Sequence, residues 1–103
     1  MVLPPQLSPE DRARALEKAA FARRERADLK NRLKMGSLSL RELLEQAETN
    51  EIYGKTKVLA VLESLPGVGK VKARRAMEEV GIADTRRLRG LGKEQRAKLL
   101  ELF

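Results

Sequence analysis

Residues 9–35 constrain the fold most, because the pattern of this stretch permits one long, unbroken helix. Ser8 is a favourable N-cap, Pro9 suits the first helical position, and two acidic residues follow in the first turn. Nothing breaks the helix before Gly36. At 1.5 Å per residue it is roughly 40 Å long. A chain of 103 residues builds only a modest core, so part of the helix must be exposed.

The centre of this long helix is basic and offers little to bury. Such a helix is consistent with a solvated arm that lies along a phosphate backbone or enters a major groove. The alternative is a charged face that contacts nothing. Phe21 differs from its neighbours and is either a core anchor or a self-association contact. The candidate arm contacts are Arg23, Arg24, Arg26 and Lys30.

Residues 65–73, Leu-Pro-Gly-Val-Gly-Lys-Val-Lys-Ala, form a glycine-rich turn that opens into a basic helix. Pro66 ends the helix before it, while Gly67 and Gly69 permit a tight turn and a close approach to a ligand. The first amides of the new helix favour a phosphate. An ordinary turn between core helices is the alternative, but the surrounding charge favours a phosphate-binding site. Its candidate residues are Gly67, Val68, Gly69, Lys70, Lys72 and Arg74.

A second basic turn, residues 85–92, places three arginines within four positions. Folding alone explains this cluster poorly, because like charges repel and a loop has the freedom to separate them. A phosphate ladder or a narrow minor groove would favour the cluster. The candidate residues are Arg86, Arg87, Arg89 and, at the start of the last helix, Lys93.

The remaining pattern predicts an all-α chain with an extended leader at residues 1–7 and a single helical domain at 8–103. The long helix occupies 8–35, and further helices are expected at about 39–50, 55–64, 70–80 and 93–102. Ser39 and Glu42 form a capping box for the second helix. Ile82 and Leu88 are expected in the core. Within the last helix, Lys93, Arg96 and Lys98 are expected to face solvent.

Charge and composition point to nucleic acid as the partner. The net charge is +7 and the pI is about 10.1, which is typical of proteins that bind a dense negative surface. Residues 51–103 carry +5 of this charge. The chain has neither cysteine nor histidine, which excludes thiolate nucleophiles, imidazole bases and the usual zinc sites. We therefore expect no cofactor, no metal and no enzyme.

A membrane partner and a secretory signal are not expected either. Aromatic residues make up 3% of the chain, too few for a helix that inserts a bulky apolar face into lipid. There is no apolar run long enough to span a bilayer, and the first residues lack a signal-peptide core. The protein is expected in the cytoplasm.

The pattern of residues 55–103 resembles a helix-two-turn-helix module, which also occurs in a ribosomal small-subunit head protein and in formamidopyrimidine-type DNA glycosylases. A wider resemblance, to the actinobacterial integration host factor family, covers nearly the whole chain. It is carried by Pro5, Leu7, residues 15–20, 22–24, 30–34, 62–73 and 86–92.

This resemblance implies an all-helical nucleoid protein that binds duplex DNA with little sequence preference. It further implies bending or compaction of DNA and help in phage integration, with a phage integrase as a partner in a nucleoprotein complex. A free monomer is expected. The residues carried over are Gly67, Val68, Gly69, Lys70 and Lys72 in the first turn and Arg86, Arg87 and Arg89 in the second, with the long helix as a second contact. Departures from the family pattern are Phe21, Thr56 and the end of the chain at Phe103.

Ribosomal RNA binding is the second candidate function, because backbone contacts do not by themselves distinguish A-form from B-form helices. The ribosomal family does not share the N-terminal match. A glycosylase would need an N-terminal proline nucleophile and a cysteine zinc finger. A P-loop is excluded by Ser64 and Val71, which stand where a glycine and a magnesium-binding hydroxyl belong. Pro66 or Val68 is a candidate apolar wedge at a base step.

Overall fold

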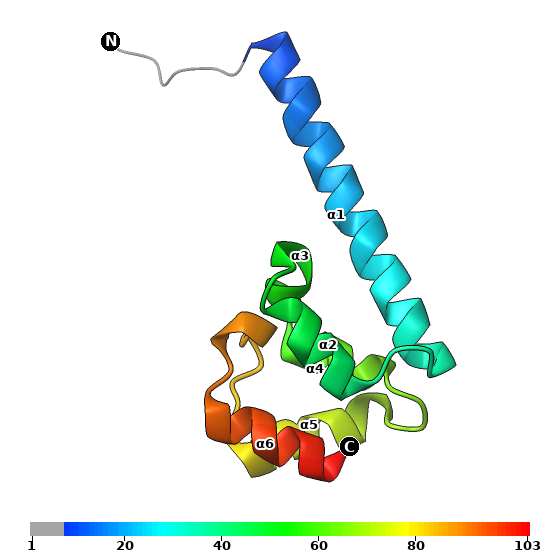
Figure 1. Ribbon diagram of the computed structural model, residues 1–103, viewed down its shortest axis with the longest axis vertical. Coiled ribbons are helices and arrows are strands. Elements are labelled where there is room, and N and C mark those ends of the chain that lie inside the picture. Colours follow the sequence, from blue (N-terminus) through cyan, green and yellow to red (C-terminus); the bar gives the residue numbers. More distant parts are fainter. Residues whose placement is uncertain (1–7) are drawn as a thin grey trace.

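A single helix projects from a small helical body in the computed structural model, which describes residues 8–103 (Figure 1). The described chain measures 54 × 31 × 25 Å. Its elements are α1 (Pro9–Met35), α2 (Leu40–Ala47), α3 (Glu51–Gly54), α4 (Val58–Ser64), α5 (Gly69–Val80), the 3₁₀ turn η1 (Leu88–Gly90) and α6 (Lys93–Leu102). The predicted all-α class and the long first helix are confirmed. The leader predicted at residues 1–7 lies outside the described residues.

The N-terminus of α1 is capped as the sequence predicts. The Ser8 hydroxyl accepts a hydrogen bond from the Asp11 amide at 3.1 Å. Arg14 pairs with Asp11, three positions earlier on the same helix face, at 3.7 Å. Asp28 and Arg32 pair at 2.8 Å. These exposed pairs contribute little to stability.

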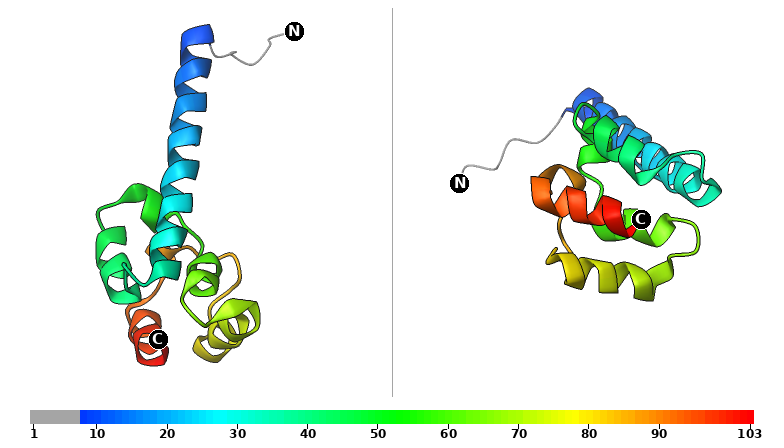
Figure 2. Two further views of the ribbon diagram at one scale, coloured as in Figure 1. Left: turned by 90° about the vertical axis from the view of Figure 1, so that its right-hand side faces the viewer. Right: turned by 60° about the horizontal axis from the view of Figure 1, so that its bottom comes forward.

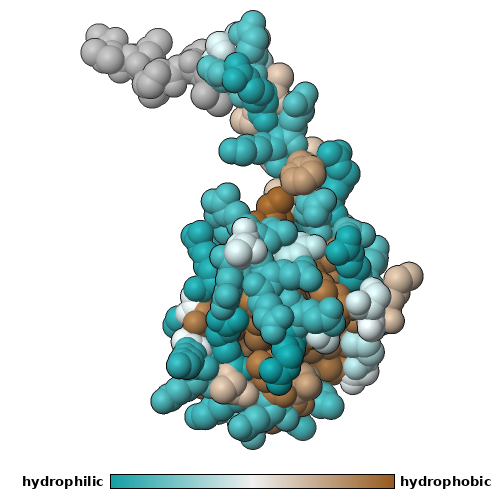
Figure 3. Space-filling model, in the orientation of Figure 1, coloured by the Kyte–Doolittle hydropathy of each residue, from teal (hydrophilic) through white to brown (hydrophobic). Residues whose placement is uncertain are grey.

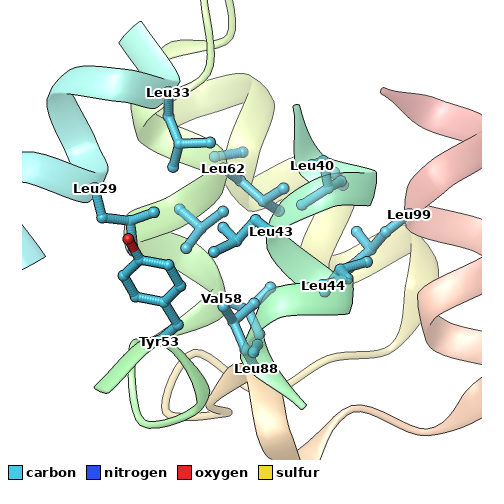
Figure 4. Packing of buried hydrophobic residues seen from close by; sticks show 14 of the residues in the cluster. Leu29, Leu33, Leu40, Leu43, Leu44, Tyr53, Val58, Leu62, Leu88 and Leu99 are labelled. Carbon is cyan, nitrogen blue, oxygen red and sulfur yellow. The ribbon is translucent and has the colours of Figure 1, made fainter. Parts of the chain in front are cut away.

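Only the C-terminal part of α1 reaches the core. Leu29 and Leu33 are fully buried, whereas Leu16 is 62% exposed and Phe21 is 50% exposed. These two leucines join one cluster with side chains from α2, α3, α4, η1 and α6, in which Tyr53 of α3 lies beside Leu29 (Figure 4). The N-terminal part of α1 therefore has no share in the core and forms the expected arm. Phe21 is not a core anchor.

The boundaries around α3 differ from the sequence expectation. α2 ends at Ala47, and a short helix, α3, then occupies Glu51–Gly54. Asn50 caps it, because its side-chain oxygen accepts a hydrogen bond from the Tyr53 amide at 3.1 Å. Buried Thr56 donates its hydroxyl hydrogen to the Ile52 carbonyl at 2.9 Å. Residues 55–57 are consequently a turn that precedes α4, and not its first residues.

Arg96 joins α6 to α2 instead of facing solvent as the sequence suggested. Its guanidinium donates to a Glu48 carboxylate oxygen at 2.9 Å and to the Leu44 carbonyl at 3.1 Å. The side chain is only 31% exposed. The sequence pattern placed it outside because the partner carbonyl lies 52 positions away.

We expect Arg96→Ala to lower the free energy of unfolding by about 1.5 kcal/mol, since hydrogen bonds to charged groups contribute on that scale. The measurement is the midpoint of urea denaturation. Lys98→Ala, which removes an exposed cation from the same helix, is the control and should change the midpoint little. Equal losses in the two variants would contradict a specific link between α2 and α6.

Candidate nucleic-acid interface

The turn before α4 is joined to the second basic turn by backbone pairing. The Val58 amide donates to the Arg86 carbonyl at 2.9 Å, and the Leu88 amide donates to the Thr56 carbonyl at 3.0 Å. Lys57 and Arg87 form an antiparallel bridge between these bonds. Residues opposite each other in such a pair lie side by side, so two cations distant in sequence become neighbours.

A surface groove of about 340 Å³ begins at this bridge and runs between α1 and α4. Its lining includes Thr56 and Ala60 but no carboxylate. Glu51 pairs with Lys55 at 3.4 Å, outside this lining. The cations of the groove come from three segments and are Arg26, Lys30, Lys55, Lys57 and Arg87. A hollow with this excess of positive charge attracts polyanions.

The groove continues toward the first basic turn. A second hollow of about 280 Å³ shares Lys30 and Ala60 with the first one and reaches Lys34, Gly69 and Lys70. α4 lies beside the lower end of α1, with α5 next to it (Figure 2). We call the two connected hollows the basic groove. It links the two predicted turns along α1, with Lys30 at its centre.

The first turn has the geometry that its glycines predict. Gly67 and Gly69 have φ angles of 73° and 69°, in the left-handed region that favours glycine. A Cβ built on either residue would meet nothing within 4 Å. Val68 caps α5 without a side-chain hydrogen bond. The first amides and the dipole of this twelve-residue helix are thus oriented as an anion site requires.

The arginines of the second turn also contribute to folding, which corrects the sequence-based interpretation. Arg86 donates to the Gly90 carbonyl at 2.8 Å, and Arg87 donates to the Lys55 carbonyl at 3.3 Å. The Lys55 carbonyl belongs to the turn before α4, and the Gly90 carbonyl belongs to the second basic turn. Both arginine side chains nonetheless remain exposed, and Arg87 lines the basic groove.

Arg89 lies in a different place from the basic groove. It borders a hollow of about 240 Å³ together with Glu48 and Arg96. We call this site the apolar hollow, and its floor consists of Leu44, Ala47, Leu88 and Leu91. The 3₁₀ turn therefore separates Arg87 from Arg89, which relieves the repulsion expected within the cluster.

The other predicted contact residues do not line the basic groove. Arg74 pairs with Asp84 at 3.6 Å, and both side chains remain largely exposed. Val68 is half-buried and packs against the core. Exposed positions are also held by Arg23, Arg24, Gly67, Lys72 and Lys93. Of the predicted residues, the basic groove brings together Arg26, Lys30, Gly69, Lys70 and Arg87.

Residues 8–103 contain neither a membrane-spanning helix nor a cluster of metal-binding side chains. Every helix in that range falls short of the length or the apolar character needed to cross a bilayer. Nowhere in the same range do three or more acidic side chains gather closely enough to hold a metal ion.

The chain is similar to proteins of known families. The model of the S13-like H2TH domain matches residues 33–103. The integration host factor of Streptomyces coelicolor is 61% identical over 103 residues, which span 100% of this chain and 95% of that protein. The corresponding protein of Mycobacterium tuberculosis is 62% identical over 99 residues, or 96% and 94% of the two chains. The chain belongs to the actinobacterial integration host factor family.

A solved structure of this family also matches the fold. The structure of sIHF bound to an 8 bp palindromic DNA aligns with a TM-score of 0.82 and 57% sequence identity. The alignment covers 84% of this chain and 98% of the other. Most of this chain therefore shares its fold with that protein.

Three cations of the basic groove were missed in the sequence, namely Lys34, Lys55 and Lys57. A local signal exists for each. Lys34 follows Lys30 by four positions and shares its helix face. Lys55 and Lys57 lie on either side of Thr56 between two helices, where lysine side chains are normally exposed.

Proposed function

We propose that this chain is an architectural DNA-binding protein that holds the duplex backbone in the basic groove. The observation that carries the proposal is the convergence of seven cations on one groove whose lining includes a single carboxylate, Glu63. Phosphates spaced along a strand suit such a row of charges. The groove presents side chains that reach phosphates and no set of planar amides aimed at base edges, which favours binding with little sequence preference.

The arm extends this contact beyond the groove. Arg23 and Arg24 are exposed on α1 within one turn of Arg26, on its N-terminal side. We propose that a duplex held by the two turns curves so that it also contacts the arm. Smooth bending of a short site costs a few kcal/mol, which the added phosphate contacts offset. Bending and compaction of DNA are thus part of the proposal.

The relatives support DNA as the polyanion. They are named integration host factor, and the solved neighbour holds a palindromic DNA. We extend this to a nucleoid location in the cytoplasm, a free monomer, and assembly with a phage integrase on DNA. A catalytic role is not part of the proposal.

The first test is fluorescence anisotropy with matched DNA and RNA duplexes over a series of salt concentrations. We expect tighter binding to DNA, little change when the sequence is scrambled, and a log–log salt slope of about −5, the value for five or six neutralised phosphates. Tighter binding to duplex RNA would instead support the ribosomal alternative. Absence of binding to both would overturn the proposal.

A further inference from the structure

The arm meets the body at a hollow that is distinct from the basic groove. This hollow has a volume of about 420 Å³ and lies between α1 and α3, and we call it the arm cleft. Its apolar lining consists of Ala19, Phe21, Ala22 and Ile52, and Figure 3 shows apolar atoms at this junction of arm and body. Phe21 is 50% exposed. Its ring is available to a ligand, because burial of an aromatic ring removes a large apolar area from water.

The arm cleft adjoins the basic groove. Arg26 and Lys55 line both of them, so a strand whose phosphates lie in the groove reaches the cleft with its next nucleotide. The other charged residues of the cleft lining are Lys18 and Glu51, and Glu51 is paired with Lys55 at 3.4 Å. A nucleotide combines an anionic phosphate with a flat base whose faces are apolar, and the groove and the cleft together offer a site for each part.

The residues beside the ring favour a base and not a phosphate. Glu17 and Glu25 lie about one turn on either side of Phe21 on the arm, outside the lining of the arm cleft. Two carboxylates disfavour a phosphate at the ring itself. A nucleobase is uncharged, and its amino groups can donate hydrogen bonds to a carboxylate. The phosphates therefore remain with Arg26 and Lys55, while the base reaches Phe21.

We infer that the arm cleft holds an unpaired nucleobase, stacked on Phe21, beside a duplex in the basic groove. The inference rests on the proposed function, because the bound duplex positions the strand. Paired bases cover each other's faces in a duplex, so the base must come from a single-stranded segment or be extruded, and extrusion costs free energy. The favoured ligand is therefore a duplex with a single-stranded extension. A cavity of roughly 150 Å³ holds benzene, so the cleft has room for a base of one or two rings.

The first test compares a blunt hairpin duplex with the same duplex carrying a short single-stranded extension, by fluorescence anisotropy. We expect the parent chain to bind the extended duplex roughly tenfold more tightly, since stacking of a base on an aromatic side chain contributes on that scale. An abasic extension of the same length supplies the same phosphates without bases. It should bind little more tightly than the blunt duplex, which separates stacking from added charge.

Variants of Phe21 test the role of its ring. Phe21→Ala and Phe21→Leu should bind the blunt duplex as the parent chain does but lose the preference for the extension, because leucine keeps apolar bulk and lacks a flat ring. Leu16→Ala is the matched control. Leu16 is 62% exposed on the same arm but lies about 140° around the helix from Phe21, at 3.6 residues per turn. This variant should keep the preference of the parent chain.

Phe21→Trp gives a direct signal, because the chain contains no other tryptophan. Stacking on a base should quench the fluorescence of this variant with the extended duplex, and not with the blunt or the abasic one. Leu16→Trp places the same fluorophore on the other side of the arm. It should show no difference among the three ligands.

Two results would overturn the inference. One is equal affinity of the parent chain for the blunt and extended duplexes, and the other is a Phe21→Ala variant that keeps the preference. If the preference is missing and Phe21→Ala instead abolishes self-association of the DNA-free chain in sedimentation, Phe21 is a contact between copies. Absence of binding to the blunt duplex would overturn the proposed function. Quenching of Phe21→Trp by a single-stranded oligonucleotide would still decide whether the arm cleft holds a base.

Discussion

The variant Lys30→Ala/Lys57→Ala should bind duplex DNA about thirtyfold more weakly than the parent chain at physiological salt. Lys30 lines both parts of the basic groove, and Lys57 stands beside Arg87 in the bridge. Each lysine lost from a phosphate contact removes about 1 kcal/mol of binding free energy. The loss of about 2 kcal/mol from both lysines corresponds to an affinity about thirtyfold weaker. The salt slope should become shallower by about 2. Anisotropy titrations over a salt series measure both quantities.

The matched control is Arg41→Ala/Lys98→Ala. Both residues are exposed, on α2 and α6, and neither lines the basic groove. Each double variant lowers the net charge by two, so a general electrostatic attraction would weaken equally in both. We expect the control to retain nearly the parent affinity and slope. Equal losses would mean that the overall field, and not the groove, holds the DNA.

The parts of this site that the sequence predicted are those fixed by neighbouring residues. Proline and glycine at 66, 67 and 69 restrict the backbone locally, and the first turn has the expected conformation. Ser8 and the capping box at Ser39 likewise act within one helical turn. Such features can be predicted from a single sequence because the interacting residues are only a few positions apart.

The missed parts depend on contacts between distant residues. Lys57 becomes a groove residue only because the turn before α4 pairs with Arg86 and Leu88. Arg96 was placed in solvent because its acceptor on α2 is far away in the chain. The four-residue α3 is too short for a periodic signal. Tertiary pairing therefore brings Lys57 and Arg87 together in the basic groove, which the local pattern of exposed lysines does not predict.

Gly69→Ala should weaken DNA binding by roughly tenfold or more, beyond its effect on stability. Its φ of 69° strains alanine by roughly 1–2 kcal/mol. A Cβ at this position meets no protein atom within 4 Å and points into space at the groove that Gly69 lines. A methyl group there would hold a phosphate away from the first amides of α5. Loss of one charge-assisted hydrogen bond accounts for the factor of ten.

Gly81→Ala separates this steric effect from backbone strain. Gly81 ends the same helix with a φ of 82°, and a Cβ there also meets nothing within 4 Å. Both variants should lower the melting temperature by several degrees, since 1 kcal/mol corresponds to about 4–8 °C in a domain of this size. Only Gly69→Ala should lose affinity at a temperature where both are folded. Equal losses of affinity would mean that strain in α5 causes the effect. No loss of affinity in either variant would mean that the start of α5 does not contact DNA and that only the lysines and arginines bind it.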